Sequence, residues 1–221
     1  MSSSRFPGKV LAPLFGRPLI QHVLGGVRQA LPWSTDIVVV TSDGPSDDPL
    51  AVYVTALGVK VFRGPLEDVF ARFRAAMRIY PHEYVLRICA DSPFPNHNIL
   101  RRIAAHTTGD EYDLVTTTYP RTFARGQNAE LIRAATFLSI DPESLAAEER
   151  EHVTAVYYRH PERYRILNLS SEDPQSEPAS LAVDRLDDLL RLERFTRSDV
   201  EAVTRVRHRD TSETTEVTPS C

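Results

Sequence analysis

The sequence is poor in cysteine, lacks a long apolar run and carries no excess of basic residues, and each absence excludes a class of protein. Only Cys89 and Cys221 occur, which excludes a disulfide framework or a zinc cluster and favours a reducing compartment. No apolar run approaches the roughly 20 residues of a membrane span, and the first residues do not resemble a signal peptide. The net charge of −4 argues against a general nucleic-acid binder. We therefore expect a cytoplasmic protein without nucleic-acid or membrane partners.

The first half of the chain shows an alternation of helix and strand patterns. Its 221 residues, 42% of them hydrophobic, suffice for one α/β domain with a sizeable core. Short turns between the elements predict a mainly parallel sheet with helices on both faces. Ligands of such sheets bind at the carboxyl ends of the strands. Apolar spacing and turn residues predict helices over 18–30, 47–57, 65–80 and 96–105, and strands over 37–41, 59–62, 84–88 and 114–118.

The second half is less regular. The patterns predict a helix over 148–159, a strand over 164–169, a polar loop over 170–178, a short strand over 181–183 and a helix from there to about 194. The end from 207 is rich in Thr, Ser and Glu and predicts a disordered tail. The expected organisation is one domain over 1–206, incomplete at its N-terminal side, and a polar tail over 207–221.

The first nine residues have the composition of a phosphate-binding loop. Ser3 and Ser4 precede Arg5, and a Pro-Gly turn ending at Gly8 separates Arg5 from Lys9. Small residues let main-chain N–H groups approach an anion, and the two cations neutralise its charge. A solvated tail that happens to contain two basic residues explains the same pattern.

Two aspartates follow predicted strands. Asp91 comes after the strand over 84–88, and Asp184 after the one over 181–183. Mg²⁺ is bound by a few carboxylates together with phosphate oxygens, so the pair and the N-terminal loop predict a metal–triphosphate site. A helix cap or turn is the alternative role for each aspartate.

Two polar segments of the second half are further candidates for ligand contacts. The block from Arg150 to Thr154 places His152 on a helix, where it could bind an anionic substrate or orient a carboxylate. The segment from Gly126 to Glu130, with Asn128 between them, joins a turn to a short strand and could contact sugar hydroxyls. A solvated helix and ordinary turn chemistry explain these segments equally well.

Read in order, these segments resemble the sugar-acid cytidylyltransferases, of the spore coat polysaccharide biosynthesis protein F type. The resemblance spans residues 2 to about 195. Its most specific parts are the loop at 3–11 and the Glu-Arg-Glu-His-Val-Thr block at 149–154. Further agreement lies at 16–20, 40–43, 62–64 with 67–69, 87–93, 126–130, and 183–184 with 187–189.

The resemblance implies a Rossmann-like nucleotidyltransferase fold. It also implies that a sugar hydroxyl attacks the α-phosphate of CTP and pyrophosphate leaves, in the synthesis of a surface polysaccharide. Carried over by position, Arg5, Lys9 and Asp91 are the expected catalytic residues, and Asp91 and Asp184 the expected ligands of Mg²⁺. The implied nucleotide contacts are Ser3, Ser4, Arg5, Gly8, Lys9, Thr41, Ser42 and Arg63, and the implied sugar contacts are Arg87, Asn128, Glu130 and His152.

The chain departs from the family pattern in two places. Family members have an apolar central strand before the phosphate-binding loop, and this chain starts after the corresponding position. Losing that strand would leave the neighbouring strands without a partner. Asn128 stands where the family often has aspartate, which points to a different sugar specificity.

Two other functions stay open at this stage. The incomplete loop suggests a degenerate, non-catalytic sugar-nucleotide-binding protein, and the fold class also admits a related glycosyltransferase. The lack of an Asp-x-Asp metal motif at a strand end argues against a glycosyltransferase. Relatives of the enzyme type are often dimers, so a homodimer is one candidate for the assembly.

Overall fold

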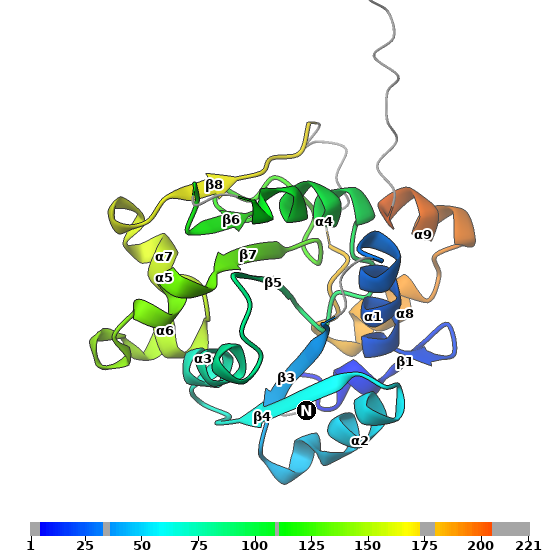
Figure 1. Ribbon diagram of the computed structural model, residues 1–221. Coiled ribbons are helices and arrows are strands. Elements are labelled where there is room, and N and C mark those ends of the chain that lie inside the picture. Colours follow the sequence, from blue (N-terminus) through cyan, green and yellow to red (C-terminus); the bar gives the residue numbers. More distant parts are fainter. Residues whose placement is uncertain (1–4, 33–35, 109–110, 173–179, 205–221) are drawn as a thin grey trace, which may run out of the picture.

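The computed structural model describes residues 5–32, 36–108, 111–172 and 180–204 (Figure 1). Ser3, Ser4 and the predicted tail over 207–221 lie outside these ranges. The first half contains β1 (Pro13–Leu14), β2 (Arg17–Pro18), α1 (Leu19–Ala30), β3 (Val38–Ser42), α2 (Asp48–Ala56), β4 (Lys60–Gly64), α3 (Val69–Ile79), β5 (Tyr84–Ile88), α4 (His97–Ala104) and β6 (Leu114–Thr116). The second half contains β7 (Ala129–Arg133), α5 (Ala134–Ser139), α6 (Ala147–Glu151), α7 (Ala155–Arg159), β8 (Ile166–Asn168), α8 (Leu186–Leu192) and α9 (Arg197–Thr204).

The predicted α/β architecture is confirmed, with sheets that are mixed rather than uniformly parallel. Strands β3 and β4 pair in parallel. The second sheet has the order β5-β7-β6-β8, in which β7 is antiparallel to both β5 and β6 while β8 is parallel to β6. Strands β5, β6 and β8 therefore point the same way, and β7 runs against them.

The starts of β3 and β5 lie close together. Asp36 lies two residues before β3 and His82 two residues before β5, and Asp36 Oδ2 and His82 Nε2 are 3.0 Å apart. The β3–β4 pair therefore begins beside the four-stranded sheet.

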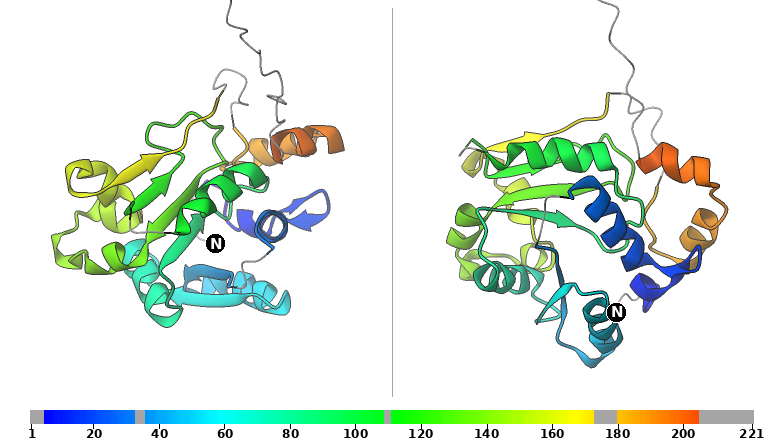
Figure 2. Two further views of the ribbon diagram at one scale, coloured as in Figure 1. Left: turned by 45° about the horizontal axis from the view of Figure 1, so that its top comes forward. Right: turned by 45° about the vertical axis from the view of Figure 1, so that its right-hand side comes forward.

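Helices cover both faces of the four-stranded sheet (Figures 1 and 2). Adjacent strand residues point to opposite faces, and Leu114 and Val115 accordingly belong to different apolar clusters. Val115 packs with buried residues of α1 and α4; in Figure 1 α4 lies at the top and α1 to the right. Leu114 packs with buried residues of α3, α5 and α7, which lie to the left.

A third apolar cluster fixes the segment that leads into α8. Leu181 and Val183 are fully buried there against Leu14, Leu19 and Leu192.

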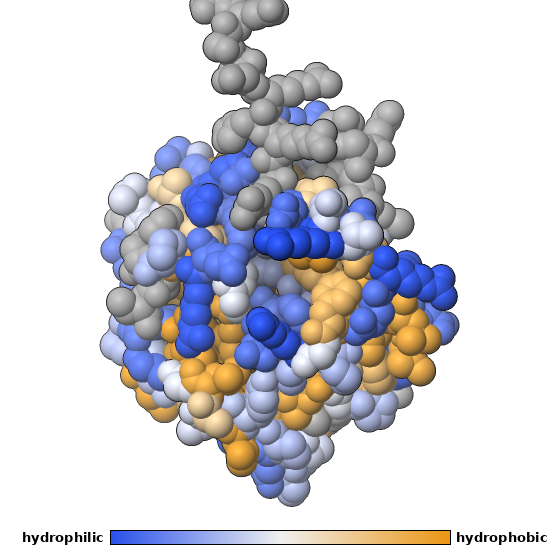
Figure 3. All heavy atoms as spheres, turned by 90° about the vertical axis from the view of Figure 1, so that its right-hand side faces the viewer, coloured by the Kyte–Doolittle hydropathy of each residue, from blue (hydrophilic) through white to orange (hydrophobic). Residues whose placement is uncertain are grey.

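Figure 3 views the side of the molecule that faces right in Figure 1, and its hydrophobic side chains form separate patches among hydrophilic ones. None of the helices in the described ranges combines the length and apolar character needed to cross a membrane.

Two sequence-based expectations were wrong in the second half. The helix predicted over 148–159 is two short helices, because His152 adopts an extended conformation at the end of α6 and Thr154 turns its hydroxyl into the interior. The strand predicted over 181–183 does not form. Leu181 N–H donates to the Arg125 carbonyl and Val183 N–H to the Asp91 carbonyl, so this segment bonds to two separate loops instead of a strand edge.

Candidate active site

Three sequence-predicted residues from distant parts of the chain meet at the carboxyl end of β5. Lys9 Nζ lies 2.7 Å from Asp91 Oδ2 and 3.1 Å from Asp184 Oδ1. Arg5 Nη2 lies 3.3 Å from the same Asp184 oxygen, in a more exposed position. Burial by itself would lower the pKa of Lys9, but hydrogen bonds and charges of the two carboxylates raise it above its ordinary value. The site therefore keeps its ammonium group charged between two carboxylates.

Local backbone structure places these side chains. Gly8 adopts a left-handed conformation with φ 74°, which favours glycine, and the chain then forms a 3₁₀ turn over Lys9–Leu11. The Val183 N–H donates to the Asp91 carbonyl at 2.9 Å. That bond ties the two aspartate-bearing segments together and brings Asp184 beside Asp91.

Neither aspartate serves as the helix cap considered from the sequence. The N-terminus of α4 is capped by Asn96, whose side chain accepts from two main-chain N–H groups. At α8 the Asp188 side chain accepts from the N–H groups of Asp184 and Arg185. Because other residues cap both helices, the carboxylates of Asp91 and Asp184 are available to a ligand.

The donor set fits a divalent cation that arrives with phosphate oxygens. Mg²⁺ in nucleotide sites takes one or two carboxylates and completes its octahedron with water and substrate phosphates. Asp91 and Asp184 already share one cationic group, the Lys9 ammonium. In the described ranges no three His, Cys, Asp or Glu side chains are arranged to hold a metal. A metal here would therefore be bound jointly by the two carboxylates and a nucleotide.

The predicted base-side residues lie at the ends of β3 and β4, beside the hydrogen-bonded loop that follows β3. Thr41 and Ser42 are buried, and Asp47 accepts from the Ser42 main-chain N–H at 2.9 Å and from its hydroxyl at 2.8 Å. Arg63 donates to the Ser42 and Gly44 carbonyls at 3.0 and 2.9 Å. The sequence predicted a helix from residue 47 but gave Asp47 no role in this loop, because that role depends on the hydroxyl groups of Thr41 and Ser42.

Asp47 gives this loop a predictable pH dependence. Burial opposes its ionisation, but hydrogen bonds from Thr41 and Ser42 hold its pKa well below the ordinary 3.8. A depressed carboxyl pKa stabilises the fold above the unfolded-state pKa, and this stabilisation is lost as the pH falls below about 4. We expect Asp47→Asn to be less stable than the wild type at pH 6 and to lose less stability between pH 5 and 3, measured by urea unfolding. If Asp47→Asn and the wild type lost equal stability between pH 5 and 3, this role would be contradicted. The control is Asp43→Asn, since Asp43 is exposed.

A second polar group lies on the sheet, between β5 and β7. Arg87 pairs with Glu130, its partner in the ladder of the two strands. Glu130 is 4% exposed and also accepts from Thr154 Oγ1 at 2.7 Å and from the Tyr158 hydroxyl. Burial would lower the pKa of Arg87, but Glu130 raises it. Burial, followed by the charge of Glu130, raises the pKa of Tyr158.

The two other predicted sugar contacts, Asn128 and His152, do not join the hydrogen bonds around Arg87 and Glu130. Asn128 is half-buried and accepts from exposed Arg121. His152 is exposed at the end of α6, and Thr154 is the member of its block that reaches Glu130. Neither Thr154 nor Tyr158 was among the site residues predicted from the sequence. The break after α6 that turns them toward Glu130 comes from tertiary packing.

Gly126 links the loop over 124–128 to the segment that carries Asp184. Its φ is 93°, and a Cβ atom at this position would lie 2.5 Å from the Ala182 main-chain nitrogen. Only glycine allows that approach. The Leu181 N–H donates to the Arg125 carbonyl at the same contact. The loop over 124–128 is thereby packed against the segment that leads to Asp184.

Removing the buried carboxylate of Glu130 should lower the free energy of unfolding far more than breaking a surface ion pair. Glu130→Ala leaves the part-buried Arg87 guanidinium without its partner, and the loss of one partner of a buried ion pair costs about 3 to 5 kcal/mol. The matched control is Glu148→Ala, which removes a pair with Arg159 in which both side chains are about half exposed and should cost at most about 1 kcal/mol. Urea unfolding of the two variants measures the difference. Equal losses would show that Glu130 does not compensate Arg87.

Comparison with known proteins identifies the family of the chain. A family model described as "Cytidylyltransferase" matches residues 1–198. The chain is 31% identical to the spore coat polysaccharide biosynthesis protein SpsF of Bacillus subtilis (strain 168), over 85% of this chain and 79% of that protein.

Solved structures share the fold. A cytidylyltransferase from Leptospira borgpetersenii serovar Hardjo-bovis superposes with a TM-score of 0.82 at 23% identity, over 90% of this chain and 85% of that one. CMP:2-keto-3-deoxy-manno-octonic acid synthetase in complex with CTP superposes with a TM-score of 0.64 at 15% identity, over 87% and 92% of the two chains. At these identities the likeness concerns the fold.

Proposed function

Because the chain belongs to the cytidylyltransferase family, we propose that it activates a sugar or sugar acid with CTP for the synthesis of a surface polysaccharide. A hydroxyl oxygen of the sugar forms a bond to the α-phosphorus of CTP. The bond from that phosphorus to the oxygen bridging to the β-phosphate breaks, and pyrophosphate leaves with the electron pair. The hydroxyl proton passes to solvent. The observation that carries this proposal is the cluster of Lys9, Arg5, Asp91 and Asp184 at the carboxyl end of β5.

Charge neutralisation is the proposed role of the two cations. Phosphoryl-type transfer is accelerated chiefly by positioning and by groups that stabilise charge on phosphate oxygens. Lys9 is a point charge with three N–H donors, and two of them face Asp91 and Asp184. Arg5 is the more exposed cation at the mouth of the cluster. Both cations would contact the triphosphate. Ser3, Ser4 and the turn at Gly8 would add main-chain N–H groups as donors to the same phosphates.

Asp91 and Asp184 would hold Mg²⁺, which neutralises phosphate charge and favours departure of pyrophosphate. Their carboxylates already bind a cationic group, and a nucleotide would supply the remaining oxygens. The proposal assigns the base of CTP to Thr41, Ser42 and Arg63, because they lie together at the carboxyl ends of the paired strands β3 and β4.

The sugar is assigned to the side of the site that contains Arg87 and Glu130. Glu130 accepts three hydrogen bonds and is nearly enclosed, so its role is to orient Arg87. Asn128 and His152 complete this proposed side. The relative's name places that protein in spore coat polysaccharide synthesis, and the same kind of product is proposed here.

The reaction is tested by ³¹P NMR of the protein with CTP, Mg²⁺ and a panel of sugars and sugar acids. We expect pyrophosphate and a CMP-sugar resonance with at least one acceptor, and weaker turnover with UTP or ATP. Hydrolysis of UDP-sugars without pyrophosphate release would instead support a glycosyltransferase. Failure of every acceptor despite CTP binding would support a binding protein that does not catalyse the reaction.

The same proposal includes the cellular compartment and the assembly state of the protein. A CTP-consuming enzyme acts where CTP is made, so we place the reaction in the cytoplasm. The proposed assembly is a homodimer, which sedimentation velocity distinguishes from a monomer. A single species at the monomer mass of 24.9 kDa would exclude it.

A further inference from the structure

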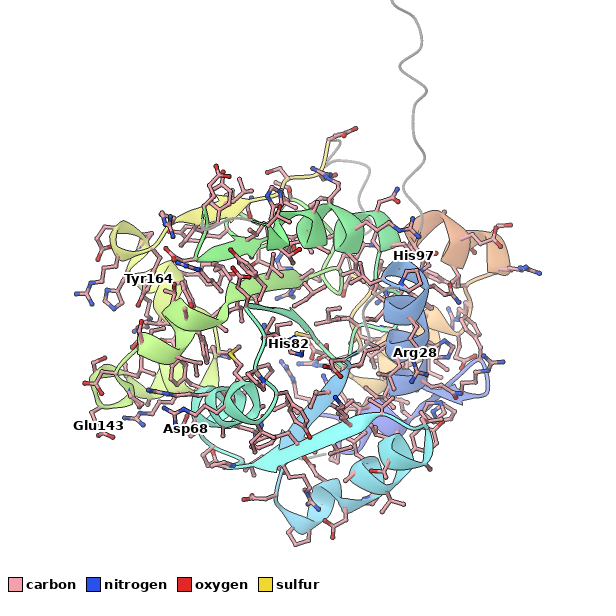
Figure 4. The ribbon with its side chains drawn as sticks, in the orientation of Figure 1. Arg28, Asp68, His82, His97, Glu143 and Tyr164 are labelled. Atoms are coloured by element: carbon pink, nitrogen blue, oxygen red, sulfur yellow. The ribbon has the colours of Figure 1, made fainter. Side chains whose placement is uncertain are left out.

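A pocket outside the candidate active site lies between α6, α7 and the loop that precedes α6. Its volume is about 370 Å³, at the small end of the range for ligand pockets, and its lining comes from 140–149 and 156–164. In Figure 4 Tyr164, which lines the pocket, and Glu143, on the turn before α6, lie at the left of the molecule. The described lining residues include no member of the cluster around Lys9. The pocket is therefore a separate candidate site.

The carboxylate of Glu149 lines this pocket and has one oxygen without a hydrogen bond. Glu149 is 4% exposed, and its Oε2 accepts from the Ala146 main-chain N–H at 2.8 Å. No donor in the described part of the chain forms a hydrogen bond to the buried Oε1. His160 Nε2 lies 3.5 Å from Oε1, beyond the ordinary hydrogen-bonding distance. Because buried carboxylate oxygens are normally hydrogen-bonded, Oε1 is the atom at which a ligand with a donor group would bind.

The floor of the pocket beside this carboxylate is apolar. Ile140, Leu145 and Val156 line it, and each is at most 7% exposed. Tyr164 adds an aromatic side chain, and aromatic rings attract cations as well as apolar groups. A matching ligand therefore has a hydrogen-bond donor at one end and a short apolar stem.

The charges around the pocket favour a cation. Glu162 contacts both side chains that can be cationic at the rim, with its Oε1 3.4 Å from Arg163 Nε and 3.9 Å from His160 Nδ1. Asp141 adds an exposed carboxylate to the lining. Because the rim cations are paired in this way, the charges of Glu149 and Asp141 favour a positively charged ligand over an anionic one.

Two arginines from other parts of the lobe hold the loop that forms one wall. Arg74 of α3 donates to the Ile140 carbonyl at 2.7 Å. Arg150 of α6 donates to the Pro142 carbonyl at the same distance. The wall is therefore formed before any ligand arrives, which lowers the ordering cost of binding.

We propose that this pocket binds a small primary amine. Its ammonium group would donate to Glu149 Oε1, in the position beside that oxygen where the His160 ring now lies, and its stem would contact Ile140 and Leu145. An ammonium group has three donors and no acceptor, and a charge-assisted hydrogen bond to a carboxylate is stronger than a neutral one. The volume favours a free amine over a segment of another protein. The inference depends on this pocket and not on the proposed reaction.

The test is a titration of the full ¹⁵N-labelled chain with n-butylamine at pH 7, where the amine is charged, followed by ¹H–¹⁵N NMR. We expect saturable shifts of the main-chain amides over 140–149 and 156–164, with a Kd of about 1 to 10 mM for so small a ligand. Two probes of matched shape separate charge from apolar contact. Neutral n-butanol and anionic butyrate should each bind at least about tenfold more weakly than the amine.

The variant that tests the carboxylate is Glu149→Gln, which keeps an acceptor for the Ala146 N–H and removes the charge. We expect it to weaken amine binding by at least about tenfold. The matched control, Glu151→Gln, changes an exposed residue of the same helix and should alter the Kd by less than about twofold.

The comparison of the three probes on the wild type requires no variant, so the proposal is tested even if Glu149→Gln fails to fold. Equal binding of butanol would assign the pocket to apolar ligands, and tighter binding of butyrate would assign it to anions through Arg163. Either result would overturn the proposal. So would undiminished amine binding by a folded Glu149→Gln variant, or no saturable shift with n-butylamine up to about 100 mM.

Discussion

Replacing Asp91 with asparagine is expected to reduce CMP-sugar formation by roughly 10³- to 10⁵-fold, because a metal ligand contributes several kcal/mol to stabilising the charge of the transition state. Asparagine keeps the size of the side chain and removes its charge. In the ligand-free protein it would also leave Lys9 with Asp184 as its one remaining carboxylate partner. The measurement is pyrophosphate release at saturating CTP and Mg²⁺.

The control for this prediction is Asp187→Asn. Asp187 is exposed, lies three residues from Asp184 and is outside the cluster. It should keep its turnover within about twofold, since exposed substitutions away from a site have small effects. Unchanged turnover in Asp91→Asn would remove Asp91 from the metal site. A Kd for Mg²⁺–CTP that rises along with the loss of turnover would support the assignment.

The second large effect is expected from Lys9→Ala. Loss of one charged donor at the phosphates should lower turnover by roughly 10³-fold. The same change removes the cation that now lies between Asp91 and Asp184. We therefore expect the variant to bind Mn²⁺ alone more tightly than the wild type does, although it turns over more slowly. Calorimetry with Mn²⁺ and the pyrophosphate assay measure these opposite changes.

The sequence offers one matched control for Lys9, because Lys60 is the chain's only other lysine. Lys60 lies in β4 and pairs with Asp36. Lys60→Ala should change neither turnover nor Mn²⁺ affinity by more than about twofold. If Lys9→Ala binds Mn²⁺ no better than the wild type, the ammonium does not compete with a metal. If neither protein binds Mn²⁺ with or without CTP, the carboxylate pair is not a metal site.

The α/β architecture was predictable because local patterns and tertiary structure agree in the first half of the chain. Strand β5 was predicted with its observed bounds, since its apolar residues stand between clear turn residues. The phosphate-loop residues and both aspartates were also predicted. Asp91 follows a strand that forms, whereas Asp184 follows a segment that main-chain hydrogen bonds to Arg125 and Asp91 hold in place. The structure then brought Lys9, Asp91 and Asp184 within hydrogen-bonding distance.

Features that depend on contacts between distant segments were not predictable. The helix pattern over 148–159 gave no sign that the chain turns after α6 so that Thr154 reaches Glu130. The segment over 181–183 has the composition of a strand, but its partners are the carbonyls of Arg125 and Asp91. The role of Asp47 depends on hydroxyl groups of the preceding strand, which lie five and six residues away along the chain.

Calorimetry on the full chain tests whether Lys9, Asp91 and Asp184 form a metal-dependent CTP site. CTP is titrated into the protein with Mg²⁺ and again with EDTA, and both titrations are repeated on the Asp91→Asn, Asp184→Asn double variant. We expect micromolar binding with Mg²⁺, at least about tenfold weaker binding in EDTA, and no metal effect in the variant. Absence of CTP binding by the folded chain, or equal binding with and without metal, would contradict this expectation.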